Sequence, residues 1–273
     1  MRQKKLAVDI GMTNIDLILE LETGLIMKML CNRPTLAVDQ LRQAFSAIEQ
    51  HLEPDLLIGV TGGHYRNLPE IVDGYEIHQV DEMTALGRGG LALAGLEEGL
   101  VVSAGTGVAM VAASVDGVSH VTGSAVGGGT LVGLSRLILQ TSNVFEIDQL
   151  AMAGDASAVD IMLSEAVGGE VGRLPAHANA VNLGKLDRQN GFTRENLAAG
   201  LVRLVAQVIA VIAINAANSV NMENIVLVGH LMDLKSIRNE IDLVGEFYRR
   251  DFTVPDKPGF GTAMGVLEVL RQS

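Results

Sequence analysis

The chain has 273 residues, of which 48% are apolar and 19% are charged. This composition is typical of a compact globular protein and excludes an intrinsically disordered one. The formal net charge of −12 argues against nucleic acid and against an anionic membrane as the main partner, because an acidic surface repels both. Cys31 is the one cysteine, so an internal disulfide is excluded and a reducing, cytoplasmic location is predicted.

Strands and helices alternate along the first hundred residues. Apolar runs bounded by turn residues predict strands at 5–10, 14–21, 25–30, 56–60 and 77–80. Helical periodicity predicts helices at 38–52 and 82–94. This stretch therefore opens with three strands joined by tight turns and continues with helix–strand units.

The same order of elements then restarts. Strands are predicted at 99–103, 108–115, 118–121, 225–228 and 252–254, and helices at 131–140, 146–152, 156–167, 193–218 and from 261 onward. The repetition predicts two related α/β lobes with a cleft between them. We assign residues 1–98 to the first lobe and residues 99–273, with inserted helices, to the second.

One segment, residues 197–217, is apolar and long enough to span a membrane. Several polar or small residues nevertheless fall near one face of it at helical spacing. They are Asn196, Gly200, Arg203, Gln207 and Asn218. A thin polar stripe on an apolar helix is typical of a buried helix in a protein core, so we expect no membrane span.

Three turns rich in small residues suggest a nucleotide site. Asp9–Asn14 and Ser103–Gly107 each follow a strand and open a hairpin, and Gly127–Thr130 leads directly into an apolar helix. Glycine lets backbone N–H groups approach a phosphate, and a helix start offers a positive field to an anion. Each hairpin turn alone is also compatible with an ordinary turn, but two in equivalent places favour phosphate binding. The predicted contacts are Gly11, Met12, Thr13, Asn14, Gly105, Thr106, Gly107, Gly127, Gly128, Gly129 and Thr130.

Acidic residues follow two of the predicted strands. Asp9 ends the first strand, where a carboxylate can hold Mg²⁺ through water in a phosphoryl-transfer site. Glu82 begins the helix that follows residues 77–80, and a carboxylate there can act as a general base toward a hydroxyl. An acid in the first turn is also common because it stabilises the helix dipole. Asp81 is the rival candidate for the catalytic role, and these residues alone leave the alternatives open.

The stretch from Val121 to Leu137, with its glycine triplet followed by Gly-Leu-Ser, resembles the type II pantothenate kinases of the actin and sugar-kinase superfamily. The similarity runs the full length of the chain. It includes Val8–Thr13, Thr61–Gly63, the segment at Glu82, Ala104–Gly107, Leu150–Asp155, Asn224–Gly229 and Gly259–Gly265. The glycine triplet with Gly-Leu-Ser is the specific part, whereas the first two turns are shared across the superfamily.

The resemblance implies an α/β fold of two actin-like, ribonuclease-H-like lobes and a homodimer. It implies ATP-dependent phosphorylation of the 4′-hydroxyl of pantothenate, the first step of coenzyme A biosynthesis, with Glu82 as the catalytic base and ATP and Mg²⁺ as cofactors. It adds Val144, Gly229 and His230 to the nucleotide contacts. The residues placed on the substrate side are Ser103, His120 and Thr122.

Several positions depart from the family pattern. Met12 replaces a glycine of the first turn, and Asp16 stands where the family tends to have a lysine. Ser103 replaces an asparagine, Thr122 replaces a glycine, and His120 occupies the place of an arginine on the pantothenate side. Histidine cannot grip a carboxylate bidentately as arginine does, which leaves open a same-fold kinase for another small hydroxy acid. The further alternatives are an actin-like ATPase that acts on a protein partner and a nucleotide-binding regulator without catalysis.

Overall fold

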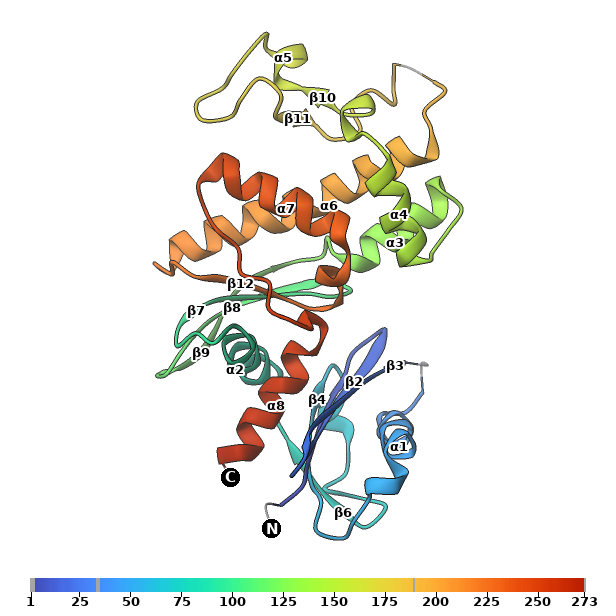
Figure 1. Ribbon diagram of the computed structural model, residues 1–273, viewed down its shortest axis with the longest axis vertical. Coiled ribbons are helices and arrows are strands. Elements are labelled where there is room, and N and C mark those ends of the chain that lie inside the picture. The colour runs from blue at the N-terminus through green and yellow to red at the C-terminus, as the bar shows by residue number, and fades with distance from the viewer. Residues whose placement is uncertain (1–2, 33–34, 189, 273) are drawn as a thin grey trace.

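A six-stranded sheet forms the base of the first lobe in the computed structural model, which describes residues 3–32, 35–188 and 190–272. The strands are β1 (Lys5–Ile10), β2 (Asn14–Leu21), β3 (Gly24–Cys31), β4 (Leu57–Gly62), β5 (Ile71–Val72) and β6 (Tyr75–Gln79), in the order β3-β2-β1-β4-β6-β5. β1, β4 and β6 are parallel, whereas β2, β3 and β5 run antiparallel to their neighbours. Helix α1 (Ala37–Ala47) packs on one face of this sheet (Figure 1).

The second lobe repeats this arrangement on a four-stranded sheet. Its strands are β7 (Gly99–Ala104), β8 (Val108–Ser114), β9 (Gly117–Ser124) and β12 (Ile225–Val228), in the order β12-β7-β8-β9. β7 takes the place of β1 and opens two hairpins, and β12 lies parallel to it as β4 does to β1. The predicted pair of related α/β lobes is confirmed.

A glycine marks the equivalent position of both lobes. Gly62 follows the β4 core with a φ of +105°, and Gly229 follows β12 with a φ of +97°. A side chain on Gly62 would meet the Ile10 carbonyl oxygen at 2.3 Å, and one on Gly229 would meet that of Ala104 at 2.5 Å. Only glycine combines this backbone conformation with so close an approach. In both lobes the strand end is therefore held tightly against the turn that follows the central strand.

Two helices cross between the lobes. Helix α2 (Glu82–Ala94) packs on the second sheet, whereas α8 (Gly261–Gln272) packs on the first (Figure 1). Glycines allow the crossing, because a side chain on Gly265 would lie 1.7 Å from the Ala85 carbonyl oxygen and one on Gly89 would lie 1.8 Å from that of Gly261. The lobe boundary at residue 98 stays a prediction. Helix α2 precedes this residue but packs on the second sheet, and α8 follows it but packs on the first.

Helix α6 (Arg194–Ser219) lies in the core of the second lobe. It packs with α3 (Gly128–Ile138), α4 (Val144–Ala153) and α7 (Lys235–Tyr248) beside the second sheet. It is the one helix in the described part of the chain that is long and apolar enough to cross a membrane, and 61% of its most apolar window is buried inside the protein. The prediction of a buried helix is confirmed.

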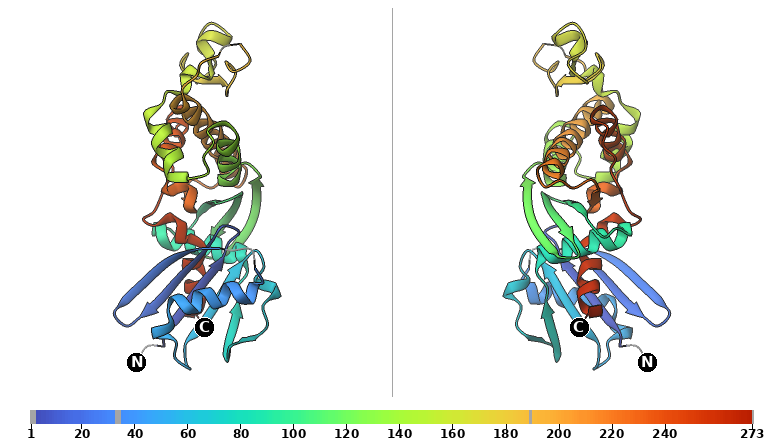
Figure 2. Two further views of the ribbon diagram at one scale, coloured as in Figure 1. Left: turned by 90° about the vertical axis from the view of Figure 1, so that its right-hand side faces the viewer. Right: turned by 90° about the vertical axis from the view of Figure 1, so that its left-hand side faces the viewer.

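The polar stripe of α6 holds the segment 154–188, which stands apart at the end of the molecule (Figures 1 and 2). This segment contains η3 (Ala156–Ala158), β10 (Ile161–Met162), α5 (Leu163–Ala166) and β11 (Asn179–Val181). Asn196 accepts a hydrogen bond from the Asp155 amide at 2.9 Å, and Arg203 forms an ion pair with the buried Asp160 at 3.5 Å. The stripe is therefore an attachment surface within the protein.

Three stretches differ from the prediction. The helix expected at 156–167 was wrong, because the chain turns at the buried Asp160, whose carboxylate accepts a hydrogen bond from the Leu183 amide, and then forms β10. Helix α7 was not predicted, although Ile237, Ile241 and Val244 have helical spacing and are all buried. The strand expected at 252–254 is reduced to a single bridge between Thr253 and β12.

Candidate active site

The first two glycine turns meet between the lobes. The hydroxyl oxygens of Thr13 and Thr106 lie 2.9 Å apart and share a hydrogen bond. The first turn is also held from behind, since the Asn32 amide nitrogen donates to the Thr13 carbonyl at 2.8 Å and its side chain donates to that of Gly11. Met12 lies at the tip of this turn and is 82% exposed, so its bulk is accommodated in solvent.

The third turn packs directly on the second. The amides of Gly128 and Gly129 donate to the carbonyls of Gly105 and Thr106 at 2.8 Å and 2.9 Å. A side chain on Gly127 would lie 2.9 Å from the Thr106 carbonyl oxygen. The glycine triplet is therefore required for this packing. Because two of its amides already have partners within the protein, a phosphate here would rely on other groups of the turns.

Asp9, the penultimate residue of β1, lies in a crowded acidic environment. Burial, followed by the charges of Asp16 and Glu82, raises its pKa to about 7, against the opposing effects of His230 and of a hydrogen bond from Thr262. Asp9 and Asp16 are direct neighbours in the β1–β2 register. Such an excess of negative charge is relieved by a proton or by a cation.

Glu82 and Asp81 have different surroundings at the start of α2. Asp81 is the N-cap, and its carboxylate accepts hydrogen bonds from the Thr84 amide at 3.0 Å and from the Thr84 hydroxyl at 3.1 Å. Burial, followed by the charge of Asp81, raises the pKa of Glu82, while Arg66 acts in the opposite direction. Asp81 is thus engaged in capping the helix, whereas Glu82 has the perturbed carboxylate expected of a general base.

A histidine joins the two lobes behind the turns. His230, the first residue of η4 (His230–Asp233), contacts Asp16 of β2 through Nε2 at 2.9 Å and Asp233 through Nδ1 at 2.7 Å. Its ring lies against Gly259, where a side chain would fall 2.1 Å from Cε1. Burial opposes a charge on His230, but the two carboxylates outweigh burial and raise its pKa to about 10. Asp16, unexpected from the resemblance, is therefore the partner of a charged histidine.

Arg66 is a residue that the sequence reasoning missed. It lies on η2 (Tyr65–Asn67), directly after β4 and Gly63. Its Nε donates to the Tyr65 hydroxyl at 3.0 Å, and its guanidinium stands 5.4 Å from the centre of that ring. A carboxylate oxygen of Asp81 is 3.7 Å away, and the side chain is 77% exposed. Its position three residues after the Gly62-Gly63 turn was the sequence signal that could have identified it as a site residue.

The predicted substrate residues lie on the second sheet. Ser103 is on β7, and His120 and Thr122 are on β9. The β8–β9 register shifts here, so that Met110 faces Thr122 while Val111 faces His120. Such a bulge re-aims side chains beside a site, and His120 is exposed. Val144, predicted as a nucleotide contact, is the first residue of α4.

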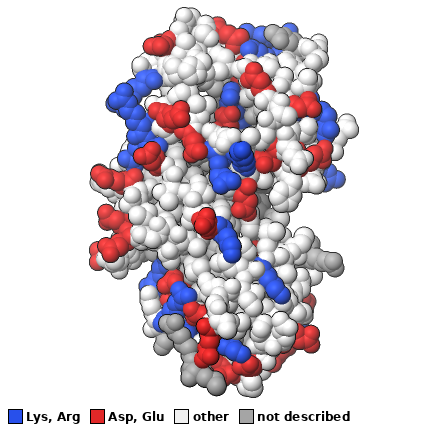
Figure 3. Space-filling view, viewed as in Figure 1, with Lys and Arg blue, Asp and Glu red and all other residues white. Residues whose placement is uncertain are grey.

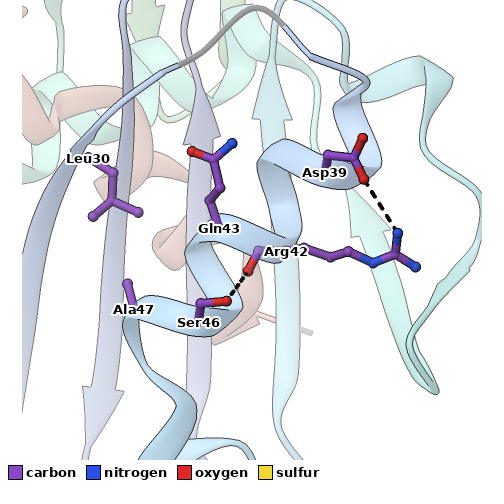
Figure 4. A pocket seen from close by; sticks show the side chains of 6 residues that line it. All are labelled: Leu30, Asp39, Arg42, Gln43, Ser46 and Ala47. Carbon is purple, nitrogen blue, oxygen red and sulfur yellow. Dashed lines mark hydrogen bonds and ion pairs between the residues drawn. The ribbon is translucent and has the colours of Figure 1, made fainter.

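A hollow lies on the first lobe. It has a volume of about 500 Å³ and lies on α1 and β3, lined by Leu30, Asp39, Arg42, Gln43, Ser46 and Ala47 (Figure 4). The Arg42 side chain turns toward Asp39 at 3.4 Å. None of the predicted site residues lines this hollow, so it is separate from the three turns. On the face shown in Figure 3, acidic and basic side chains are interspersed and the outline narrows between the lobes.

Comparisons with known protein families and sequences find relatives of this chain among the pantothenate kinases. The Fumble family model matches residues 99–253. A type II pantothenate kinase from Oceanobacillus iheyensis is 25% identical over 184 residues, which are 65% of this chain and 68% of that enzyme.

Solved structures of the same fold cover nearly the whole chain. Component A of the (R)-2-hydroxyglutaryl-CoA dehydratase of Acidaminococcus fermentans has a TM-score of 0.67 at 16% identity, over 97% of this chain and 96% of that one. A ROK family glucokinase from Streptomyces griseus, in complex with glucose and AMPPNP, has a TM-score of 0.61 at 14% identity, over 99% and 100%. At these identities the likeness establishes the actin-like fold alone. Because the family model covers more than half of its length, the chain belongs to the Fumble family.

Proposed function

We propose that this protein transfers the γ-phosphoryl group of ATP to the 4′-hydroxyl of pantothenate. The observation that carries the proposal is the Fumble match, together with the named pantothenate kinases among the relatives. The chain is a kinase by this relationship. The half-buried carboxylate of Glu82, at the start of α2, supplies the chemical group that such a transfer needs.

In this reaction the turns bind the phosphates of ATP and Glu82 acts as the general base. The backbone and hydroxyl groups of the turns at Thr13 and Thr106 hold the phosphates across the cleft. Glu82 accepts the proton of the acceptor hydroxyl as its oxygen bonds to the γ-phosphorus, and the bond from that phosphorus to the β–γ bridging oxygen breaks to release ADP. Orientation and charge stabilisation provide most of the rate in such reactions. The raised pKa of Glu82 makes it a better proton acceptor than an ordinary carboxylate.

Asp9 fits the role of holding Mg²⁺. Its half-buried carboxylate lies near the charges of Asp16 and Glu82, and this excess of negative charge favours a divalent cation. No group of three or more potential metal ligands occurs among the described residues, which suits Mg²⁺, since it is usually bound by one or two carboxylates, water and the substrate phosphates. When bound, the ion would neutralise charge on the phosphates. Val144, Gly229 and His230 would contact the rest of the nucleotide, and the homodimer and cytoplasmic location belong to the same proposal.

A phosphate-transfer assay with ATP, Mg²⁺ and pantothenate, run beside a reaction without acceptor, tests the proposal. Glu82→Gln should lower kcat by about 10²- to 10⁴-fold while the affinity for ATP stays within about twofold, because the turns are unchanged. Glu97→Gln, which changes an exposed acid three residues beyond the end of α2, is the matched control and should be fully active. A fully active Glu82→Gln enzyme would exclude this residue as the base.

His120 favours one second candidate, a kinase for another small hydroxy acid. Its exposed side chain on β9 is a weaker carboxylate ligand than an arginine. A panel of hydroxy acids compared by kcat/KM separates the two candidates. Preference for another acid over pantothenate would favour the second.

A further inference from the structure

Positive charge is scarce around the proposed site. The segments 9–16, 61–66, 81–82, 103–107 and 117–130 contain a single lysine or arginine, which is Arg66. The other cation of the site, His230, is bound on both sides by Asp16 and Asp233. Within these five described segments, an anionic acceptor entering beside Asp9 and Glu82 therefore finds one available lysine or arginine, Arg66.

The local contacts of Arg66 leave its guanidinium open to a ligand. The Tyr65 ring that orients it is only 8% exposed and therefore fixed in place. The ion pair with Asp81 is long, at 3.7 Å, and solvated, with side chains that are 77% and 51% exposed. Exposed pairs of this kind contribute little, and the Asp81 carboxylate is already bound by Thr84. An incoming carboxylate can displace this contact without leaving a buried charge unpaired.

The sheet order places Arg66 on the acceptor side of the site. The first turn follows β1, Arg66 follows β4 and Glu82 follows β6, and these three strands are consecutive neighbours. Adjacent strands lie about 4.8 Å apart, so the strand that leads to Glu82 lies about 10 Å from the strand that leads to the first turn. Arg66 stands near Glu82, because its guanidinium lies 3.7 Å from a carboxylate oxygen of Asp81, the residue directly before Glu82.

We propose that Arg66 binds the carboxylate of the acceptor. The inference rests on the proposed function and adds the residue that selects the substrate. A guanidinium holds a carboxylate through two parallel N–H···O bonds. With the carboxylate held at Arg66, the hydroxyl of the same molecule is directed to Glu82.

The test compares pantothenate with its neutral N-alkyl amide, which keeps the hydroxyl and lacks the carboxylate. Arg66→Ala should raise the KM for pantothenate by about 10- to 100-fold, with kcat and the KM for ATP within about twofold. The KM for the amide should not change. Arg66→Lys should recover part of the loss. Arg42→Ala, which removes the same charge from α1 outside the site, is the control and should behave as wild type.

Three results would overturn the inference. An unchanged KM for pantothenate would exclude the contact. An equal loss with both acceptors would mean that Arg66 acts through Glu82, and a raised KM for ATP would place it on the phosphates. If the wild-type protein phosphorylates neither acceptor, the proposed acceptor is wrong, and Arg66 is tested with other hydroxy acids against their amides. The inference then requires that the acids be preferred and that Arg66→Ala abolish the preference.

Discussion

The crossing of α2 and α8 should tolerate no side chain at Gly265. In Gly265→Ala the new methyl group would lie 1.7 Å from the Ala85 carbonyl oxygen, whereas a real side chain does not approach a backbone atom within 3.0 Å. The backbone of α2 cannot yield locally, because its carbonyl groups are bound within the helix. The two helices must therefore separate by roughly 1 Å or more.

This separation has a cost that can be estimated. It loosens α8 from the first sheet, where Ala263, Val266 and Leu267 are fully buried. Overpacking a close contact costs about 1–3 kcal/mol, sometimes more, and the gain of about 1 kcal/mol from replacing glycine in a helix offsets only part of it. We expect a net loss of about 2–3 kcal/mol, which corresponds to a fall in Tm of about 4–12 °C for a chain of this size.

Thermal unfolding followed by circular dichroism measures the effect, and Gly133→Ala is the matched control. Gly133 lies inside α3, and a side chain there would meet no atom within 4 Å. The control should therefore raise Tm slightly through helix propensity alone. If Gly265→Ala unfolds within about 1 °C of the wild type, the shift is far smaller than expected. The two helices would then not be as rigidly packed as this reasoning requires.

Two further predictions concern charged groups. Arg203→Met should lower the free energy of unfolding by about 3 kcal/mol in urea titrations, because Asp160, with 0% exposure, loses its cation; an unchanged midpoint would mean that Asp160 is neutral in the native state. The pKa of His230 is raised from 6.5 to about 10, so its contribution to stability is complete below pH 6.5 and is lost as the pH rises toward 10. Urea midpoints measured across this range should therefore fall more steeply for wild type than for His230→Gln, and parallel curves would contradict the assigned pKa.

Local features of this protein could be read from its sequence. The central strands of both lobes end at small-residue turns, and the apolar pattern and glycine positions located them within one or two residues. Helix α2 begins at Glu82 and ends at Ala94, as predicted, because Asp81 caps its start and Gly95 ends it in a left-handed conformation. The polar stripe of α6 was also recognisable, since helical spacing alone places those residues on one face.

Relations between distant residues could not be predicted in the same way. The Asp16–His230 contact joins residues that are 214 positions apart, and neither residue carries a local sign of the other. The glycine triplet was interpreted as a phosphate loop, but its amides at Gly128 and Gly129 bind the second turn, a fact that depends on the packing of two loops. The roles of Glu82, Asp9 and the substrate-side residues stay predictions until the assays above are made.

The packing of α8 on the first sheet also constrains how the chain can fold during synthesis. One face of that sheet, which includes Ala7 and Ile18, is covered by residues of α8. α8 is translated long after β1–β6, and at about 5–20 residues per second the delay is on the order of ten seconds. During this interval the nascent first lobe exposes an apolar sheet face to the cell. Synthesis of residues 261–272 therefore completes the core of the first lobe at a late stage. A chain stalled before this segment would need a chaperone to cover the exposed sheet face.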